Sequence, residues 1–108
     1  MISPGGFAVR YTDAARDDLL RLFDFLLERA QTADDFDLAQ RAIDAVVEAV
    51  ERQLGRTPFI FRKAGSSPFL RELIIPFGHA GYVVLYEVRD ASTVDILAVR
   101  HQREDDYH

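Results

Sequence analysis

The chain has 108 residues, of which 48% are hydrophobic and 11% aromatic, and its 13 lysines and arginines against 18 acidic residues give a formal net charge of −5. This length and composition predict a single folded domain spanning 1–108, with flexible ends at 1–6 and 104–108. The sequence contains no cysteine, which excludes disulfides, thiolate metal sites and cysteine nucleophiles. No apolar run approaches the roughly 20 residues that span a membrane, and the first residues lack the pattern of a secretory signal, so we expect a cytoplasmic protein without membrane contact.

The charge is distributed unevenly along the chain. Residues 1–51 carry 5 arginines and 11 acidic residues, a net of −6, whereas residues 52–103 carry 8 cations and 4 acidic residues, a net of +4. The remaining acids lie in the last five residues. This asymmetry indicates that the two halves have different neighbours.

A short strand and two helices are predicted in the first half. Phe7, Val9 and Tyr11 alternate on one face of a strand. Apolar residues at three- and four-residue spacing then predict helices over 13–30 and 34–54. Thr12 or Asp13 can cap the first helix, and Gly55 follows the second. Because the intervening turn is short, the helices should pack as an antiparallel hairpin.

The second half reads as a connection followed by three strands. Residues 55–68 form the connection, and the strands cover 69–75, 81–88 and 93–100, with Pro76 ending the first of them. The strand at 81–88 is apolar on both faces for most of its length, which predicts a central position in the sheet. Its tyrosines, Tyr82 and Tyr86, are expected to be core or half-buried residues of the sheet and not a platform for stacked bases. The order β-α-α-β-β-β predicts an α+β fold in which the helix hairpin packs on a mostly antiparallel four-stranded sheet.

Several short motifs in this order resemble the RelE/ParE superfamily of bacterial toxins from type II toxin–antitoxin systems, and more closely its ParE branch. The resemblance covers Val9 to about Arg103. It rests on Tyr-Thr-Asp-Ala-Ala-Arg-Asp-Asp-Leu at 11–19, Leu-Gly-Arg-Thr-Pro at 54–58, Leu-Arg-Glu-Leu at 70–73, Tyr-Val-Val-Leu-Tyr-Glu-Val at 82–88 and Val-Asp-Ile-Leu-Ala-Val-Arg-His at 94–101.

This resemblance implies a toxin that a cognate antitoxin, ParD-like or of another family, neutralises in a hetero-oligomeric complex. Toxins of the ParE branch inhibit DNA gyrase and so block replication, whereas toxins of the RelE branch cut messenger RNA in the ribosomal A site. A third alternative is a degenerate member that acts only as an antitoxin-binding or autorepressor partner. The fold alone does not choose among them.

A ribosome-dependent nuclease of this kind would use a cluster of cations with a Tyr, His or Glu near the chain end. The sequence offers these residues for the cluster: Arg62, Lys63, Arg71, Arg100, His101, Arg103 and Tyr107. Of these, Arg71, Arg100, His101 and Tyr107 would be the catalytic set of an RNase. Each also has a plain structural interpretation: a salt bridge for the arginines, a strand-end histidine, and a frayed tail for the tyrosine.

Three observations favour gyrase inhibition over RNA cleavage. Strand alternation places Arg100 and His101 on opposite faces, so that only one of them can share a cleft with Arg71. The acids at 104–106 would repel RNA phosphate beside Tyr107. A single lysine and a net charge of −5 fit a ribosomal site poorly. We therefore expect a non-enzymatic inhibitor that does not bind nucleic acid by itself, with target contacts at Arg71, Arg100, His101 and Arg103.

The antitoxin surface is predicted on the helix hairpin, which carries more apolar surface than one small sheet face can cover. Its candidate residues are Leu20, Phe25, Leu27 and Phe36. No metal or other cofactor is expected, because His79, His101 and His108 lack ligand spacing.

Overall fold

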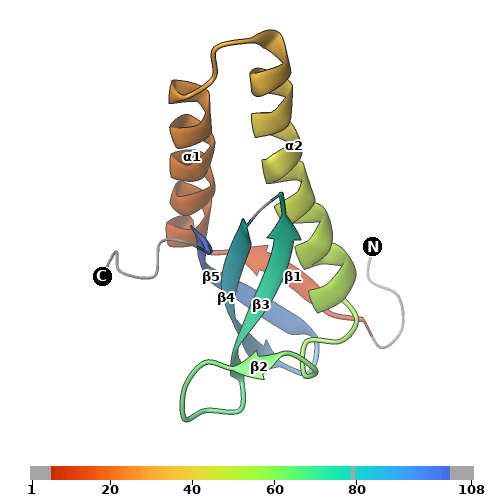
Figure 1. The fold of residues 1–108 in the computed structure, drawn as a ribbon. Coiled ribbons are helices and arrows are strands. Elements are labelled where there is room, and N and C mark those ends of the chain that lie inside the picture. The colour runs from red at the N-terminus through yellow and green to blue at the C-terminus, as the bar shows by residue number, and fades with distance from the viewer. Residues whose placement is uncertain (1–5, 79, 103–108) are drawn as a thin grey trace.

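The computed structural model describes residues 6–78 and 80–102, which form two helices packed on one face of a five-stranded sheet (Figure 1). The elements in chain order are β1 (Ala8–Tyr11), α1 (Asp13–Glu28), α2 (Ala33–Ala49), the π-helical turn η1 (Val50–Leu54), β2 (Arg62–Lys63), β3 (Leu70–Phe77), β4 (Ala80–Asp90) and β5 (Thr93–His101). The strands lie in the order β1-β5-β4-β3-β2. Strand β1 runs parallel to β5, and the other neighbours are antiparallel.

The α+β class, the helix hairpin and the central position of the strand at 81–88 are confirmed, but the expected four strands are five. The additional strand, β2, has two residues, Arg62 and Lys63, which pair with Glu72 and Arg71 of β3. It lies inside the stretch 55–68 that was expected to be only a connection. Two residues are too few to show an alternating pattern, so this strand is recognised only through its pairing partner.

The expectation that Pro76 ends its strand is wrong, because β3 continues through Pro76 to Phe77. Strand β2 covers only Arg71 and Glu72, so β3 is an edge strand at Pro76, where a missing N–H is tolerated. Pro76 lies opposite Gly81 of β4. A Cβ atom at Gly81 would collide with the Ile75 carbonyl oxygen, so only glycine fits there.

Both helices begin with a threonine cap. The Thr12 hydroxyl accepts the Ala15 N–H at 3.2 Å and donates to the Ile96 carbonyl at 2.8 Å, which ties the start of α1 to β5. Thr32 and Asp35 form a reciprocal capping box at the start of α2. The α-helical part of the second helix ends at Ala49, and the chain continues as the π-helical turn η1. The expected single helix over 34–54 is therefore divided at that residue.

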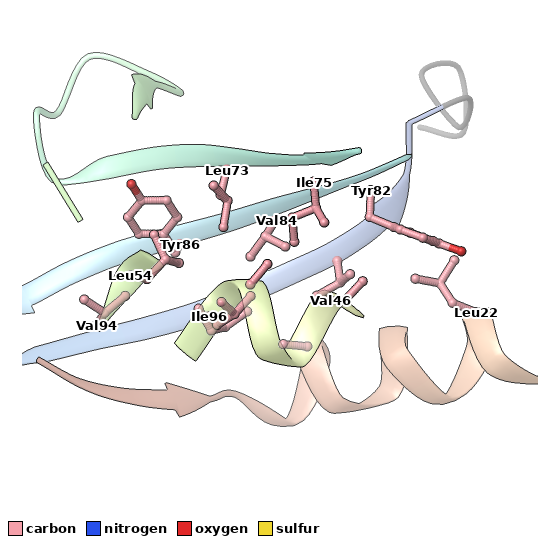
Figure 2. Close-up of a cluster of buried hydrophobic side chains, with 14 of the residues drawn as sticks. Leu22, Val46, Leu54, Leu73, Ile75, Tyr82, Val84, Tyr86, Val94 and Ile96 are labelled. Atoms are coloured by element: carbon pink, nitrogen blue, oxygen red, sulfur yellow. The ribbon is translucent and has the colours of Figure 1, made fainter. Parts of the chain in front are cut away.

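The hydrophobic core lies between the helix hairpin and the face of the sheet that it covers. Figure 2 shows side chains from α1, α2, η1 and the three longest strands pointing into one layer. Tyr82 and Tyr86 are buried in this layer, as predicted. Fully buried aliphatic residues surround them: Val46, Val50, Leu54, Leu73, Val84, Val94, Ile96 and Val99. The opposite face of the sheet carries no helix in the described chain.

A bulge in β5 is held by a side chain of α1. The pairing with β4 passes from Leu85–Ala98 to Tyr86–Ile96, which leaves Leu97 without a direct partner. The Asp18 carboxylate accepts the backbone N–H of Val99 at 2.9 Å, across 81 residues of sequence. This bond fixes α1 against the strand at the point where the ladder is irregular.

We predict that Asp18→Ala lowers the free energy of unfolding by about 1–3 kcal/mol, because the partly buried Val99 N–H loses its acceptor. Asp18→Asn should retain most of the stability, since its amide oxygen can still accept the bond. The neighbouring exposed Asp17→Ala is the matched control and should change stability by less than about 0.5 kcal/mol. Urea denaturation of the three variants measures this, and equal losses in the two alanine variants would contradict the assignment.

Candidate functional site

Arg71 of β3 holds the connection between the helices and the sheet in place. Its Nε donates to the Pro68 carbonyl at 2.7 Å, and a terminal nitrogen donates to the Phe61 carbonyl at 2.6 Å. The guanidinium carbon lies 5.6 Å from the centre of the Phe59 ring, within the range of a cation–π contact. The donors of Arg71 are therefore directed at main-chain carbonyls of its own chain.

Tyr86 holds the same connection from the core side, and we call the bonds of Arg71 and Tyr86 to this connection the clamp. Its hydroxyl donates to the Pro58 carbonyl at 2.6 Å, and the side chain is fully buried opposite Arg71 on β4 (Figure 2). Burial raises the pKa of Tyr86 to about 12, partly opposed by the positive charge of Arg71. The phenol consequently stays protonated and remains a donor throughout the neutral range.

Arg100 and His101 lie on opposite faces of β5, as predicted. Arg100 is opposite Val83 on the uncovered face of the sheet, whereas His101 is opposite Tyr82 on the covered face. The His101 ring meets the Tyr82 ring edge to face, with 5.5 Å between the ring centres. The two end residues of β5 therefore point in different directions.

His101 shares its face with Arg71 but lies at the other end of the sheet. Arg71 is opposite Tyr86 and His101 is opposite Tyr82. Four residues along β4 correspond to about 13 Å at the usual rise of a strand. The structure thus separates Arg71, Arg100 and His101 by distance or by sheet face.

The other candidates of the nuclease cluster divide into two groups. Arg62 forms an ion pair with Glu72 at 2.8 Å across the β2–β3 pair, and Lys63 is exposed beside it. Arg103 and Tyr107 lie outside the described residues, as do residues 1–5 and 104–108 of the expected flexible ends.

Sequence reasoning missed an ion-pair cluster on the uncovered face of the sheet. The carboxylate of Asp95 on β5 is 5% exposed, accepts a bond from Arg89 of β4 at 2.9 Å and lies 3.5 Å from Arg10 of β1. The hydrogen bond and negative charge of Asp95 raise the pKa of Arg89. An acid in the middle of an otherwise apolar strand was the only signal in the sequence.

The helix hairpin exposes a set of large apolar residues, which we call the helix-hairpin patch: Leu20, Phe25, Phe36 and Leu38. Leu20 is 62% exposed, while Leu27, also expected on this surface, is half-buried. The Arg29 guanidinium covers one face of Phe25, 3.7 Å from the ring centre. Acids surround a shallow hollow at Leu20 and Phe25, lined by Asp17, Asp24 and Glu28 together with Arg21.

Within residues 6–78 and 80–102, no group of three histidines and carboxylates comes close enough to hold a metal ion. In the same part of the chain, no helix is long and apolar enough to cross a membrane.

Comparison with known proteins identifies the family. A sequence model of the family described as the ParE toxin of the type II toxin–antitoxin system parDE matches residues 9–106. The chain belongs to this toxin family. The toxin is 38% identical to Toxin RelE3 of Caulobacter vibrioides over 90 residues. This aligned region covers 83% of this chain and 88% of that protein.

Two solved structures share the fold of the toxin. A structure of the chromosomal ParDE toxin–antitoxin system of P. aeruginosa superposes with a TM-score of 0.68 at 17% identity, covering 88% of this chain and 95% of the other. The RelBE2 toxin–antitoxin complex of Mycobacterium tuberculosis gives a TM-score of 0.58 at 26% identity, covering 89% and 98%. The expected RelE/ParE superfamily and fold are therefore confirmed.

We predict that Arg71→Ala lowers the free energy of unfolding by about 1–3 kcal/mol, because the Phe61 and Pro68 carbonyls lose a charged donor. Arg71→Lys should be nearly as unstable as Arg71→Ala, since a single ammonium lacks the planar guanidinium that reaches both carbonyls. Lys63→Ala, on an exposed side chain opposite Arg71, is the control and should leave stability within about 0.5 kcal/mol. Urea denaturation and limited proteolysis of residues 55–69 measure the effect; unchanged cleavage in Arg71→Ala would contradict the clamp.

Proposed function

We propose that the toxin acts by binding and inhibiting DNA gyrase, and that it does not cleave RNA. The observation that supports this most strongly is the separation of the candidate catalytic side chains. Cleavage of RNA without a metal requires a base, an acid and a cation around one phosphate, with reacting groups within hydrogen-bond reach. Arg71 and His101 lie at opposite ends of the covered face, and Arg100 lies on the other face.

The state of each side chain supports the same proposal. Two N–H groups of Arg71 bond the Phe61 and Pro68 carbonyls, so turning the guanidinium toward a phosphate would weaken its hold on the connection. The chain as a whole has a net charge of −5 and a single lysine. A net negative charge provides no long-range attraction to RNA phosphate.

In this proposal the end of β5 contacts the target. Arg100 on the uncovered face, His101 and the following Arg103 supply the polar contacts. Arg71, the remaining expected target contact, lies at the other end of the covered face, where it positions the segment 55–69. The alternative is ribosome-dependent cleavage of messenger RNA, which is favoured by the RelE name of the 38% identical relative.

A cognate antitoxin is proposed to cover the helix-hairpin patch. The two solved structures compared above are of toxin–antitoxin systems. Exposed apolar side chains surrounded by polar residues are typical of interfaces. Because acids line the hollow beside Leu20 and Phe25, the antitoxin segment that docks there should carry basic residues.

The target is tested by expressing the toxin without its antitoxin and by assaying the purified chain. We expect filamentation, SOS induction and gyrase-linked DNA breaks in cells, and inhibition of gyrase supercoiling in vitro. Arg100→Ala should weaken that inhibition about tenfold, equivalent to about 1.4 kcal/mol. Arg52→Ala, exposed on η1, is the control. Rapid loss of translation with cuts in the ribosomal A site would overturn the proposal, and an absence of toxicity would indicate a degenerate family member.

The antitoxin surface is tested by Leu20→Ser combined with Phe25→Ser. We expect at least tenfold weaker binding to the antitoxin, because truncation of central apolar anchors in an interface costs more than about 1.4 kcal/mol. Ile60→Ser removes an even more exposed apolar residue elsewhere and should bind as the unaltered chain does. Titration calorimetry measures both affinities. Equal affinities would place the antitoxin elsewhere.

A further inference from the structure

The connection between η1 and β3 exposes a second apolar surface, far from the helix-hairpin patch. We call it the loop patch; it consists of Phe59, Ile60 and Phe69, which are 46%, 71% and 49% exposed. Figure 1 shows this connection at one end of the molecule and the turn between α1 and α2 at the other. Two partners could therefore occupy the two patches at the same time.

The loop patch is held rigidly although it belongs to a connection. The Phe59 ring meets Phe7 and Phe69 edge to face, with ring centres 6.4 and 6.2 Å apart. Tyr86 and Arg71 bond the carbonyls of Pro58, Phe61 and Pro68, as described above. An apolar surface that is ordered in advance loses little conformational entropy on binding, which favours a docking role.

A pocket opens beside the loop patch. It has a volume of about 290 Å³ and lies between Phe59 and Phe69 on one side and the β4–β5 hairpin, from Val88 to Ala91, on the other. Its walls are mostly apolar. A pocket of this kind suits one aromatic or branched aliphatic side chain, because small apolar recesses are where interface anchors are buried.

The charge around the loop patch is opposite to that of the chain. Residues 55–71 contain Arg56, Arg62, Lys63 and Arg71 and no acidic residue, a net of +4, so the rest of the chain carries −9. Arg56 and Lys63 are exposed. The carboxylate of Asp90, which lines the pocket, is turned to the N–H and hydroxyl of Ser92 at 2.9 and 3.2 Å. Arg62 is ion-paired with Glu72 of β3 at 2.8 Å, so the exposed Arg56 and Lys63 are the cations through which the loop patch favours a negatively charged partner.

We propose that the loop patch docks an acidic polypeptide segment of a second protein partner, distinct from the segment that covers the helix-hairpin patch. An aromatic or aliphatic side chain of that segment enters the pocket between Phe59 and Phe69. Its carboxylates lie against Arg56 and Lys63. The occupant is defined by this chemistry and does not depend on whether gyrase is the target of the toxin.

The same features disfavour a nucleic acid or a second copy of the chain as the occupant. The rings meet edge to face, and Arg71 lies over Phe59, so no pair of parallel ring faces is available for stacked bases. The most exposed residue, Ile60, is aliphatic. A symmetric dimer would place two segments of net charge +4 against each other.

The proposal is tested by selecting a phage-displayed random 12-residue peptide library against the full chain. We expect enriched peptides that are acidic and carry an aromatic or aliphatic residue. A synthetic peptide of the enriched sequence should bind the unaltered chain at least tenfold more tightly than it binds Phe59→Ser/Phe69→Ser, and more weakly as salt rises. Leu20→Ser/Phe25→Ser is the matched control and should bind it equally well.

A second variant keeps the test independent of folding. Arg56→Glu/Lys63→Glu changes only exposed side chains and should also reduce peptide binding at least tenfold, with an unchanged thermal melt. The proposal is overturned if no acidic peptide is enriched, or if binding is equal in all variants. It is also overturned if a 12-nucleotide single strand binds more tightly at this surface, or if the chain forms a dimer that Phe59→Ser/Phe69→Ser disrupts.

Discussion

Two helices covering one face of a five-stranded sheet are the constraint on which the other features of this toxin depend. The buried layer between α1, α2 and the sheet accounts for nearly all fully buried side chains. The hairpin extends beyond the sheet, as Figure 1 shows, so Phe25 and Phe36 find no strand to cover them. Within the described residues no helix packs on the other face of the sheet, which carries the ion pairs of Asp95 with Arg10 and Arg89.

Elements with a periodic apolar pattern could be predicted from the sequence. Elements that depend on hydrogen bonding between strands could not. The amphipathic stripes predicted both helices, and the apolar strand at 81–88 predicted the sheet centre, because periodicity reports which face is buried. Strand β2 exists because it pairs with β3, and β3 passes through Pro76 because it has no second neighbouring strand there. A local sequence pattern contains neither fact. In the candidate site, alternation correctly separated Arg100 from His101. The bonds of Arg71 to Phe61 and Pro68 join residues whose proximity follows from a loop conformation without a sequence signature.

The charge asymmetry seen in the sequence becomes a spatial separation in the fold. Acidic residues gather on the helix hairpin around Leu20 and Phe25, whereas residues 55–71 carry only cations. Acids predominate beside the helix-hairpin patch, although Arg21 lies among them, and cations predominate around the loop patch, although Asp90 lines its pocket. Such surfaces discriminate between partners by repulsion as well as by attraction, because the wrong partner meets like charge. The net charge of −5 is the sum of these opposite regions and does not reveal their separation.

The role of Arg71 links stability to function in this toxin. A cation on a strand near exposed aromatic rings suggests a phosphate ligand when it is viewed in isolation. In the fold its donors meet two carbonyls, and the Tyr86 hydroxyl secures a third on the same connection. These bonds order the segment that carries Phe59 and Phe69, so the rings present a defined surface that would lose little conformational entropy on binding. A residue that looks catalytic by type thereby holds in place the segment that carries the loop patch, because two of its N–H groups bond main-chain carbonyls of that segment.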